Sequence, residues 1–288
     1  MTGTLGHILA DIRLAHSVFA LPFALLGLLL GTRGAWPSPW LALQFLAAML
    51  CARSAAMGWN RLADRRYDAT NPRTAMRALP SGRVSPRAMA VFTLTCAAGF
   101  VAVAATLGPL CLAFSPLVLG VLWAYSLAKR VTSLAHLVLG LALGLAPPAA
   151  YLAARGRIDD DASIALWLGL AVLLWVAGFD VIYSAQDVEH DRREGLRSLP
   201  ARLGLRGALR VAALLHAGML AALVMAARGW GLGPLGWSAI VLVGLLLAAE
   251  HGLVRGGDLS RVDAAFFTLN GCVALAFGGL VAADRLWA

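Results

Sequence analysis

Three polar side chains at steps of four along the chain have the residue types and spacing of a metal-binding stripe. They are Asn60, Asp64 and Asp68, and they follow directly on the long apolar run at residues 41–59. On a helix, residues four apart lie on one face, so these side chains would present their oxygen atoms together. Carboxylates at the end of a membrane helix are costly unless they bind something. The stripe therefore predicts a ligand site.

A second stripe of the same kind occurs in the second half of the chain. Asp180, Tyr183 (or Ser184), Asp187 and Asp191 also fall on one helical face. Mg²⁺ favours oxygen ligands and is usually held by one or two carboxylates together with substrate phosphate. The alternative for either stripe alone is a solvated helix end with local charge pairing. Two such stripes, each beside a run of arginines, instead predict two sites that hold Mg²⁺ and, through it, a diphosphate.

A basic segment follows the first stripe. Residues 71–82 contain two prolines and a glycine that interrupt helix continuity, and they carry Arg73 and Arg77. Arginine side chains can fork onto phosphate oxygens. A loop of this kind could also carry positive charge only to fix membrane topology. The position of Arg73 and Arg77 directly after the acids favours contact with phosphate.

The composition is that of a helical membrane protein. Of the 288 residues, 60% are hydrophobic and only 14% are charged, whereas a soluble domain carries about 25% charged residues. The apolar runs are long rather than alternating, which predicts an all-α polytopic bundle forming one domain over residues 1–288. Breaks are expected at Gly108-Pro109 and at Pro147-Pro148. The nine expected transmembrane segments are residues 17–30, 41–59, 88–107, 110–127, 134–154, 164–181, 209–227, 235–249 and 264–282.

The basic residues predict the orientation in the bilayer. Eighteen of the 24 fall on one side if the N-terminus is cytoplasmic, which favours nine spans with the N-terminus inside. Both acid stripes then face the cytoplasm. The net charge of +9 is explained by this topology and indicates no nucleic-acid partner. The four cysteines are scattered and show no metal-ligand or disulfide spacing.

Four stretches of the sequence resemble one known family. The pattern N-x-x-x-D-x-x-x-D at residues 60–68, with R-T-x-x-R-x-L-x-S-G after it, resembles the first Asp-rich motif of the UbiA family of intramembrane aromatic prenyltransferases. Residues 183–195, Y-S-A-Q-D-V-E-H-D-R-R-E-G, are similar to its second motif. Residues 12–23 resemble its opening helix, and residues 125–132 resemble its Y-x-x-x-K-R-x-T segment. The resemblance covers nearly the whole chain.

The resemblance implies roles for individual residues. The catalytic residues so implied are Asp64, Asp68, Asp187, Asp191 and Arg130. The metal ligands so implied are Asn60, Asp64, Asp68, Asp187 and Asp191. The implied substrate contacts, with Arg130 also catalytic, are Arg13, Asn60, Arg73, Arg77, Lys129, Arg130, Tyr183 and Gln186.

One residue departs from the family pattern. Where members often carry a second acid after the asparagine, this chain has Arg61. The first stripe therefore has one acid fewer than the family pattern. We expect the metal ligands to differ from the usual set, or an arginine to lie near the phosphates.

The activity implied is Mg²⁺-dependent transfer of a polyprenyl group from a polyprenyl diphosphate to an aromatic acid. The expected acceptor is 4-hydroxybenzoate, alkylated ortho to its hydroxyl group, as in ubiquinone biosynthesis at a bacterial inner membrane. Other acceptors stay open, namely 1,4-dihydroxy-6-naphthoate of a menaquinone pathway, haem b and a chlorophyllide. A cation-coupled transporter is disfavoured because its acids would lie near the bilayer midplane.

A few polar residues fall outside these motifs. His216 lies in the middle of an apolar segment, and we interpret it as a helix-packing residue. His136 and His251 lie near segment ends, as residues of the membrane interface do. Asn270 in the last segment predicts an interhelical hydrogen bond.

Overall fold

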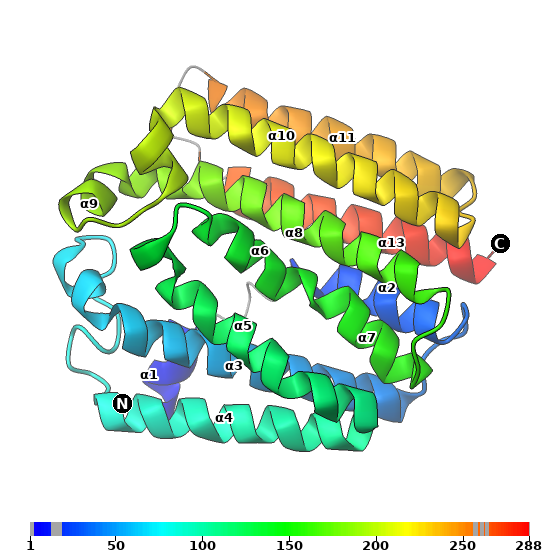
Figure 1. Ribbon diagram of the computed structural model, residues 1–288, viewed down its shortest axis with the longest axis horizontal. Helices are drawn as coiled ribbons and strands as arrows, with labels where there is room; N and C mark the ends of the chain where they lie inside the picture. The colour runs from blue at the N-terminus through cyan, green and yellow to red at the C-terminus, as the bar shows by residue number, and fades with distance from the viewer. Residues whose placement is uncertain (1–2, 13–18, 256–258, 260–261, 263–264, 288) are drawn as a thin grey trace. The chain divides into compact units, whose positions relative to one another are not determined.

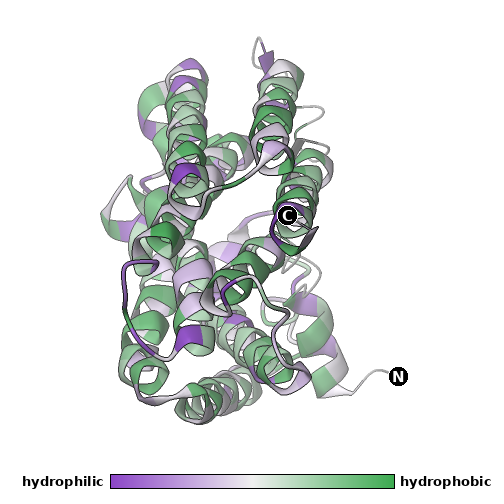
Figure 2. Ribbon diagram, turned by 90° about the vertical axis from the view of Figure 1, so that its right-hand side faces the viewer, coloured by the Kyte–Doolittle hydropathy of each residue, from purple (hydrophilic) through white to green (hydrophobic). Residues whose placement is uncertain are grey.

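The computed structural model describes residues 3–12, 19–255, 259, 262 and 265–287. The described residues form helices joined by short connections and contain no strand, which confirms the predicted all-α class (Figure 1). Coloured by hydropathy, the helices are hydrophobic over most of their length (Figure 2). The chain divides into two compact units, residues 1–17 with 39–128 and residues 18–38 with 129–288.

The first unit contains the first acid stripe. Its helices are α1 (Thr4–Asp11), α3 (Pro39–Thr70), α4 (Pro86–Leu107) and most of α5 (Pro109–Val131). Helix α3 packs along α4. A small apolar core, which includes Ile8, Ile12 and Met89, joins α1 and α4 to the loop after α3.

The second unit contains the second acid stripe. Its elements are α2 (Leu21–Gly31), α6 (Ala135–Gly144), α7 (Ala146–Arg155), α8 (Ala162–Ser184), η2 (Ala185–Asp187), α9 (Val188–Arg193), α10 (Leu199–Trp230), α11 (Pro234–Leu253), η4 (Ala265–Leu269) and α13 (Asn270–Trp287). Helix α8 packs against both α10 and α6. Trp175 of α8 is fully buried and contacts Phe23 of α2, with the two ring centroids 5.4 Å apart.

Close approach between α6 and α8 depends on a glycine. A Cβ atom on Gly140 would lie 2.2 Å from the carbonyl oxygen of Leu173. In a membrane the hydrophobic effect does not drive helices together, and they associate largely through van der Waals packing. Small residues at the interface allow the two backbones to come close enough for this packing. This contact fixes α6 against the helix that carries the second acid stripe.

Both predicted breaks are confirmed. Gly108 has φ 129° between α4 and α5, a value that favours glycine. Helix α6 ends at Gly144 and α7 begins at Ala146, two residues before Pro148. A further kink, which the apolar pattern did not predict, lies inside α10 at Gly204, where φ is 69°.

Eight helices among the described residues are long and apolar enough to cross a membrane, with α6–α7 and α8–α9 each counted as one. The first predicted segment, residues 17–30, overlaps α2, a shorter apolar helix of 11 residues that ends at Gly31. Helix α3 extends beyond the predicted end at residue 59, so the first acid stripe lies within this continuous helix. A count of nine spans and a cytoplasmic N-terminus remain predictions.

Candidate functional site

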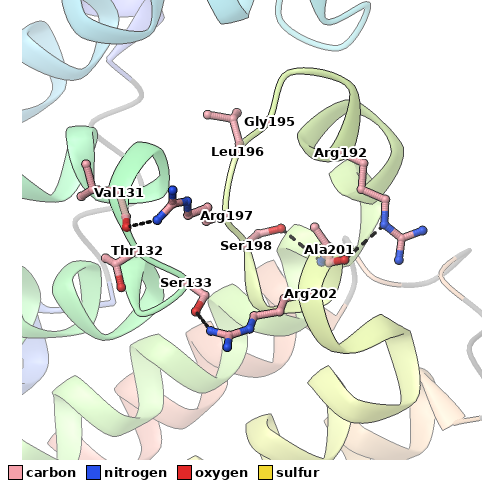
Figure 3. Close-up of a pocket in the computed structure, with 10 residues that line it drawn as sticks. All are labelled: Val131, Thr132, Ser133, Arg192, Gly195, Leu196, Arg197, Ser198, Ala201 and Arg202. Carbon is pink, nitrogen blue, oxygen red and sulfur yellow. Dashed lines mark hydrogen bonds between the residues drawn. The ribbon is translucent and has the colours of Figure 1, made fainter.

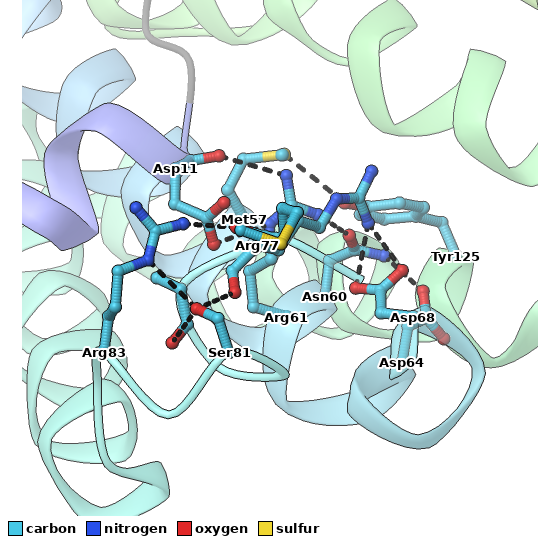
Figure 4. Close-up of polar contacts among 12 residues, drawn as sticks. Asp11, Met57, Asn60, Arg61, Asp64, Asp68, Arg77, Ser81, Arg83 and Tyr125 are labelled. Atoms are coloured by element: carbon cyan, nitrogen blue, oxygen red, sulfur yellow. Dashed lines mark hydrogen bonds and ion pairs between the residues drawn. The ribbon is translucent and has the colours of Figure 1, made fainter. Parts of the chain in front are cut away.

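The first stripe is a helical stripe, as predicted (Figure 4). Asn60 and Asp64 lie one turn apart on α3, and Asn60 Nδ2 donates to Asp64 Oδ2 at 2.8 Å. The same amide nitrogen lies 3.4 Å from Ser126 Oγ of α5. Asp64 is half-buried. The helix, together with α5, thus places a carboxylate and an amide side by side at a partly accessible position.

Arg61, the residue that departs from the family pattern, has a buried side chain that lies against Asp11 of the first unit (Figure 4). It is 4% exposed, and its Nε lies 3.2 Å from Asp11 Oδ2. Its two terminal nitrogens donate to the backbone oxygen of Asp11 at 3.1 Å and to Asn60 Oδ1 at 2.8 Å. The arginine is therefore paired with an acid from α1 and holds the amide oxygen of Asn60. Its charge is matched within the unit.

Asp68 is held by the loop that follows α3. Both of its carboxylate oxygens accept hydrogen bonds from Arg77 NH1, at 2.7 and 2.9 Å. Thr74 Oγ1 donates to the backbone oxygen of Asp68 at 3.0 Å. The Asp68 side chain is 9% exposed and that of Arg77 29%. Arg73, in the same loop, is exposed. Of the two arginines expected to act here, the structure therefore places Arg77 directly on the stripe.

The second stripe spans the end of α8, the 3₁₀ turn η2 and the short helix α9. Asp191 is 2% exposed, and its Oδ2 lies 3.9 Å from Lys129 Nζ. This oxygen has no hydrogen-bond partner among the residues that the structure describes. Asp187 is half-buried. Gln186 is exposed and donates to the backbone oxygen of Tyr183 at 3.3 Å. The unit thus contains a buried carboxylate oxygen that lies within ion-pair distance of a lysine.

A basic pocket of about 560 Å³ lies beside this stripe (Figure 3). Arg197 donates its backbone N–H to the oxygen of Lys129 at 2.7 Å, and Arg202 donates to Ser133 Oγ at 3.0 Å. Together with Arg192, these residues give the pocket three guanidinium groups and no carboxylate. Such a surface attracts anions. The residues that line it are Val131, Thr132, Ser133, Arg192, Gly195, Leu196, Arg197, Ser198, Ala201 and Arg202.

His136, which the sequence suggested as an interface residue, is instead completely buried. Its Nδ1 lies 2.6 Å from Asp180 Oδ2, and its Nε2 accepts the backbone N–H of Leu199 at 3.3 Å. The imidazole therefore joins α6, α8 and the start of α10. Asp180, the first acid of the second stripe along the chain, keeps a side chain that is 20% exposed.

The donor set of the two stripes fits Mg²⁺ bound with substrate phosphate. No group of three His, Cys, Asp or Glu side chains close enough to hold a metal ion occurs in the described part of the chain. An all-protein cage is therefore not formed by these residues, whereas Mg²⁺ commonly uses one or two carboxylates plus phosphate. The buried Asp191 oxygen without a hydrogen-bond partner is the kind of atom that such an ion would satisfy.

Some expected residues cannot be placed, and some contacts were not foreseen. Arg13 lies outside the described residues. Arg130 is half-buried next to Lys129. Sequence reasoning missed Asp11 and Ser126, because both meet the stripe through tertiary contacts from other helices. It also misjudged His136, whose position near a segment end was its only sequence signal.

Comparisons with known proteins agree with this arrangement. The sequence profile of the UbiA prenyltransferase family matches residues 20–271. A 4-hydroxybenzoate octaprenyltransferase of Citrobacter koseri is 31% identical over 249 residues, covering 85% of this chain and 83% of that protein. The apo structure of a UbiA homologue from Aeropyrum pernix K1 is 35% identical, with TM-score 0.85 and coverage of 94% and 98%. A UbiA homologue from Archaeoglobus fulgidus, solved with GPP and Mg²⁺, shares the fold at 18% identity, with TM-score 0.69 and coverage of 98% and 100%.

Proposed function

The chain belongs to the UbiA prenyltransferase family, and from this premise we propose that it transfers a polyprenyl group from a polyprenyl diphosphate to 4-hydroxybenzoate. The new carbon–carbon bond forms ortho to the acceptor's hydroxyl group, and diphosphate is released. The observation that carries the choice of acceptor is the similarity to a 4-hydroxybenzoate octaprenyltransferase over most of both chains. Fold alone would not select an acceptor.

We propose that both acid stripes are required for binding the diphosphate together with Mg²⁺. The ligands would come from Asn60, Asp64 and Asp68 in the first unit and from Asp187 and Asp191 in the second. When bound, Mg²⁺ supplies electrostatic stabilisation of the charge that develops on the leaving diphosphate. The buried, unsatisfied oxygen of Asp191 supports this assignment.

Cationic side chains beside the stripes would bind the phosphate oxygens. We assign this role to Arg73, Arg77 and Lys129, because arginine forks onto phosphate and lysine acts as a point charge. Arg77 bridges both oxygens of Asp68, so binding of a diphosphate there would exchange one anion for another. Arg130 and Arg13 are the candidates for the acceptor's carboxylate.

The helices contribute an apolar environment for the reaction. Ionisation of an allylic diphosphate gives a carbocation that water would quench. An apolar bundle interior excludes water and suits a polyprenyl tail. The side chains of Tyr183 and Gln186, between the acids of the second stripe, are further candidates for substrate contact. No covalent nucleophile is needed for this chemistry.

The protein is a multi-pass membrane protein, with eight candidate spans in the part of the chain that the structure describes. We propose that it lies in a bacterial inner membrane with its reactive side toward the cytoplasm. The uneven distribution of its basic residues supports this orientation.

The test is prenyl transfer by the purified protein in detergent with Mg²⁺. Prenyl diphosphates of several lengths are offered with 4-hydroxybenzoate and, separately, with 1,4-dihydroxy-6-naphthoate, and the products are identified by mass spectrometry. We expect a C-prenylated 4-hydroxybenzoate. A product formed only from the naphthoate would overturn the choice of acceptor, and no transfer to any aromatic acid would overturn the proposed function.

A further inference from the structure

His136 occupies a position that the proposed reaction does not yet use. It is completely buried at the start of α6, in the second unit, and it contacts a carboxylate that is one-fifth exposed. A buried histidine is ordinarily a packing residue, but this one makes two directed hydrogen bonds to different helices. Those two bonds determine where its proton lies.

The tautomer follows from the partners. The backbone N–H of Leu199 can only donate, so Nε2 of His136 accepts and carries no proton. The ring proton of the neutral imidazole is then on Nδ1, which donates to Asp180 Oδ2 at 2.6 Å. A hydrogen bond to a carboxylate is stronger than one between neutral groups. His136 therefore fixes one oxygen of Asp180 and leaves the other, Oδ1, without a hydrogen bond among the described residues.

The separation of Asp180 from the proposed metal ligands suits contact with the acceptor rather than with the phosphates. It precedes Asp187 by seven residues along α8 and η2, which corresponds to about 10 Å along a helix. If the diphosphate is bound at Asp187 and Asp191, the carbon under attack lies beyond the phosphates, toward the interior.

We propose that Asp180 accepts the proton that the aromatic ring loses and that His136 is the positioning residue that orients Asp180 for it. This inference rests on the proposed function. The allylic carbon–oxygen bond breaks and its electron pair leaves with diphosphate. A ring carbon ortho to the hydroxyl group uses a π pair to bond to the allylic carbon. The electron pair of its C–H bond then returns to the ring, and the proton passes to Asp180 Oδ1.

Two substitutions separate the two hydrogen bonds of His136. In His136→Asn the amide nitrogen lies near the position of Nδ1 and can donate to Asp180, but the bond from Leu199 is lost. In His136→Gln the amide group lies near the position of Nε2 and can accept from Leu199, but the donor to Asp180 is lost. The further variants are Asp180→Asn and the combination of His136→Gln with Asp180→Asn. A control, His251→Gln, changes another membrane histidine of the same unit, which is bonded to His216 at 3.0 Å.

The measurements are kcat, KM for both substrates, melting temperature, and the kinetic isotope effect for an acceptor deuterated ortho to its hydroxyl group. We expect His136→Gln to lose kcat by about tenfold to a hundredfold, the factor that a hydrogen bond to a charged group supplies. Its KM for the prenyl diphosphate and its melting temperature should stay close to those of the His251→Gln control. The isotope effect should increase in His136→Gln and in Asp180→Asn, because proton loss becomes slower.

The ranking of the variants by kcat tests whether His136 acts through Asp180. His136→Asn should retain more kcat than His136→Gln, and the double variant should be no slower than Asp180→Asn alone. If His136→Asn is the slower or the less stable of the two, His136 acts by fixing the start of α10 and the inference is wrong. An unchanged isotope effect in Asp180→Asn would also overturn it, without needing any His136 variant to fold. A wild-type protein that transfers no prenyl group would refute the proposed function itself, and this inference with it.

Discussion

The buried pair of Arg61 and Asp11 gives the sharpest test of the first unit. Arg61 is 4% exposed and has three contacts, two of them to Asp11. Removing one partner of a buried pair leaves an uncompensated charge and costs about 3–5 kcal/mol, whereas replacing both partners by apolar residues is often neutral. At about 2–4 °C per kcal/mol, Asp11→Leu should lower the melting temperature by roughly 6–20 °C.

The assay is a double-mutant cycle on detergent-solubilised protein. Asp11→Leu, Arg61→Met and the double variant are compared by intrinsic tryptophan fluorescence during heating. Arg65→Met is the matched control, because Arg65 is exposed on the same helix one turn later. A surface change of this kind should alter stability by no more than about 0.5 kcal/mol.

The double variant decides whether the pair acts as a unit. It should melt at a higher temperature than Asp11→Leu, because no buried charge is left alone. If the stability loss of the double variant equals the sum of the losses in the two single variants, the two residues contribute independently. An Asp11→Leu variant as stable as the Arg65→Met control would refute the reasoning altogether.

Three further predictions concern the second unit. Asn270→Leu removes the acceptor of the Trp175 indole N–H, which lies 2.6 Å away, and should cost about 1–3 kcal/mol in a thermal melt. The hydrogen bond from Tyr151 lowers the pKa of Asp159 to about 2 from its usual 3.8, so this carboxylate stabilises the fold above pH 3.8 and ceases to do so as the pH falls toward 2. Melting temperatures measured from about pH 5 downward should therefore decline more steeply for the wild type than for Asp159→Asn, and parallel curves would contradict this. Gly140→Val places a branched side chain where even a Cβ atom would lie 2.2 Å from the carbonyl oxygen of Leu173 in α8, so it should reduce the yield of folded protein, and Gly140→Ala should reduce it less.

Local patterns in the sequence were sufficient for the helical stripe and for the helix breaks. Spacing by four placed Asn60 and Asp64 on one helical face, and the structure shows their side chains bonded at 2.8 Å. The prediction of an interhelical bond at Asn270 is also confirmed, since its amide donates to Glu250 of α11 at 2.7 Å. Such features depend on residues close in sequence or on the cost of an unpaired polar group in an apolar segment.

The partners of the buried ions could not be predicted in this way. Arg61 meets Asp11 across 50 residues, and His136 meets Asp180 across 44. No periodic pattern specifies which turn of one helix faces which turn of another, because this depends on packing along the whole length of both. The departure at Arg61 was visible in the sequence, but its explanation required the acid on α1.

The roles of the two acid stripes are tested most directly by prenyl transfer in alanine variants of each. Purified wild type, Asp64→Ala and Asp187→Ala are assayed with Mg²⁺, a polyprenyl diphosphate and 4-hydroxybenzoate, after membrane insertion has been verified. Asp160→Ala, which changes an exposed loop acid, is the control. We predict that the control transfers as the wild type does and that neither stripe variant forms product. Near-wild-type transfer by either stripe variant would contradict the account.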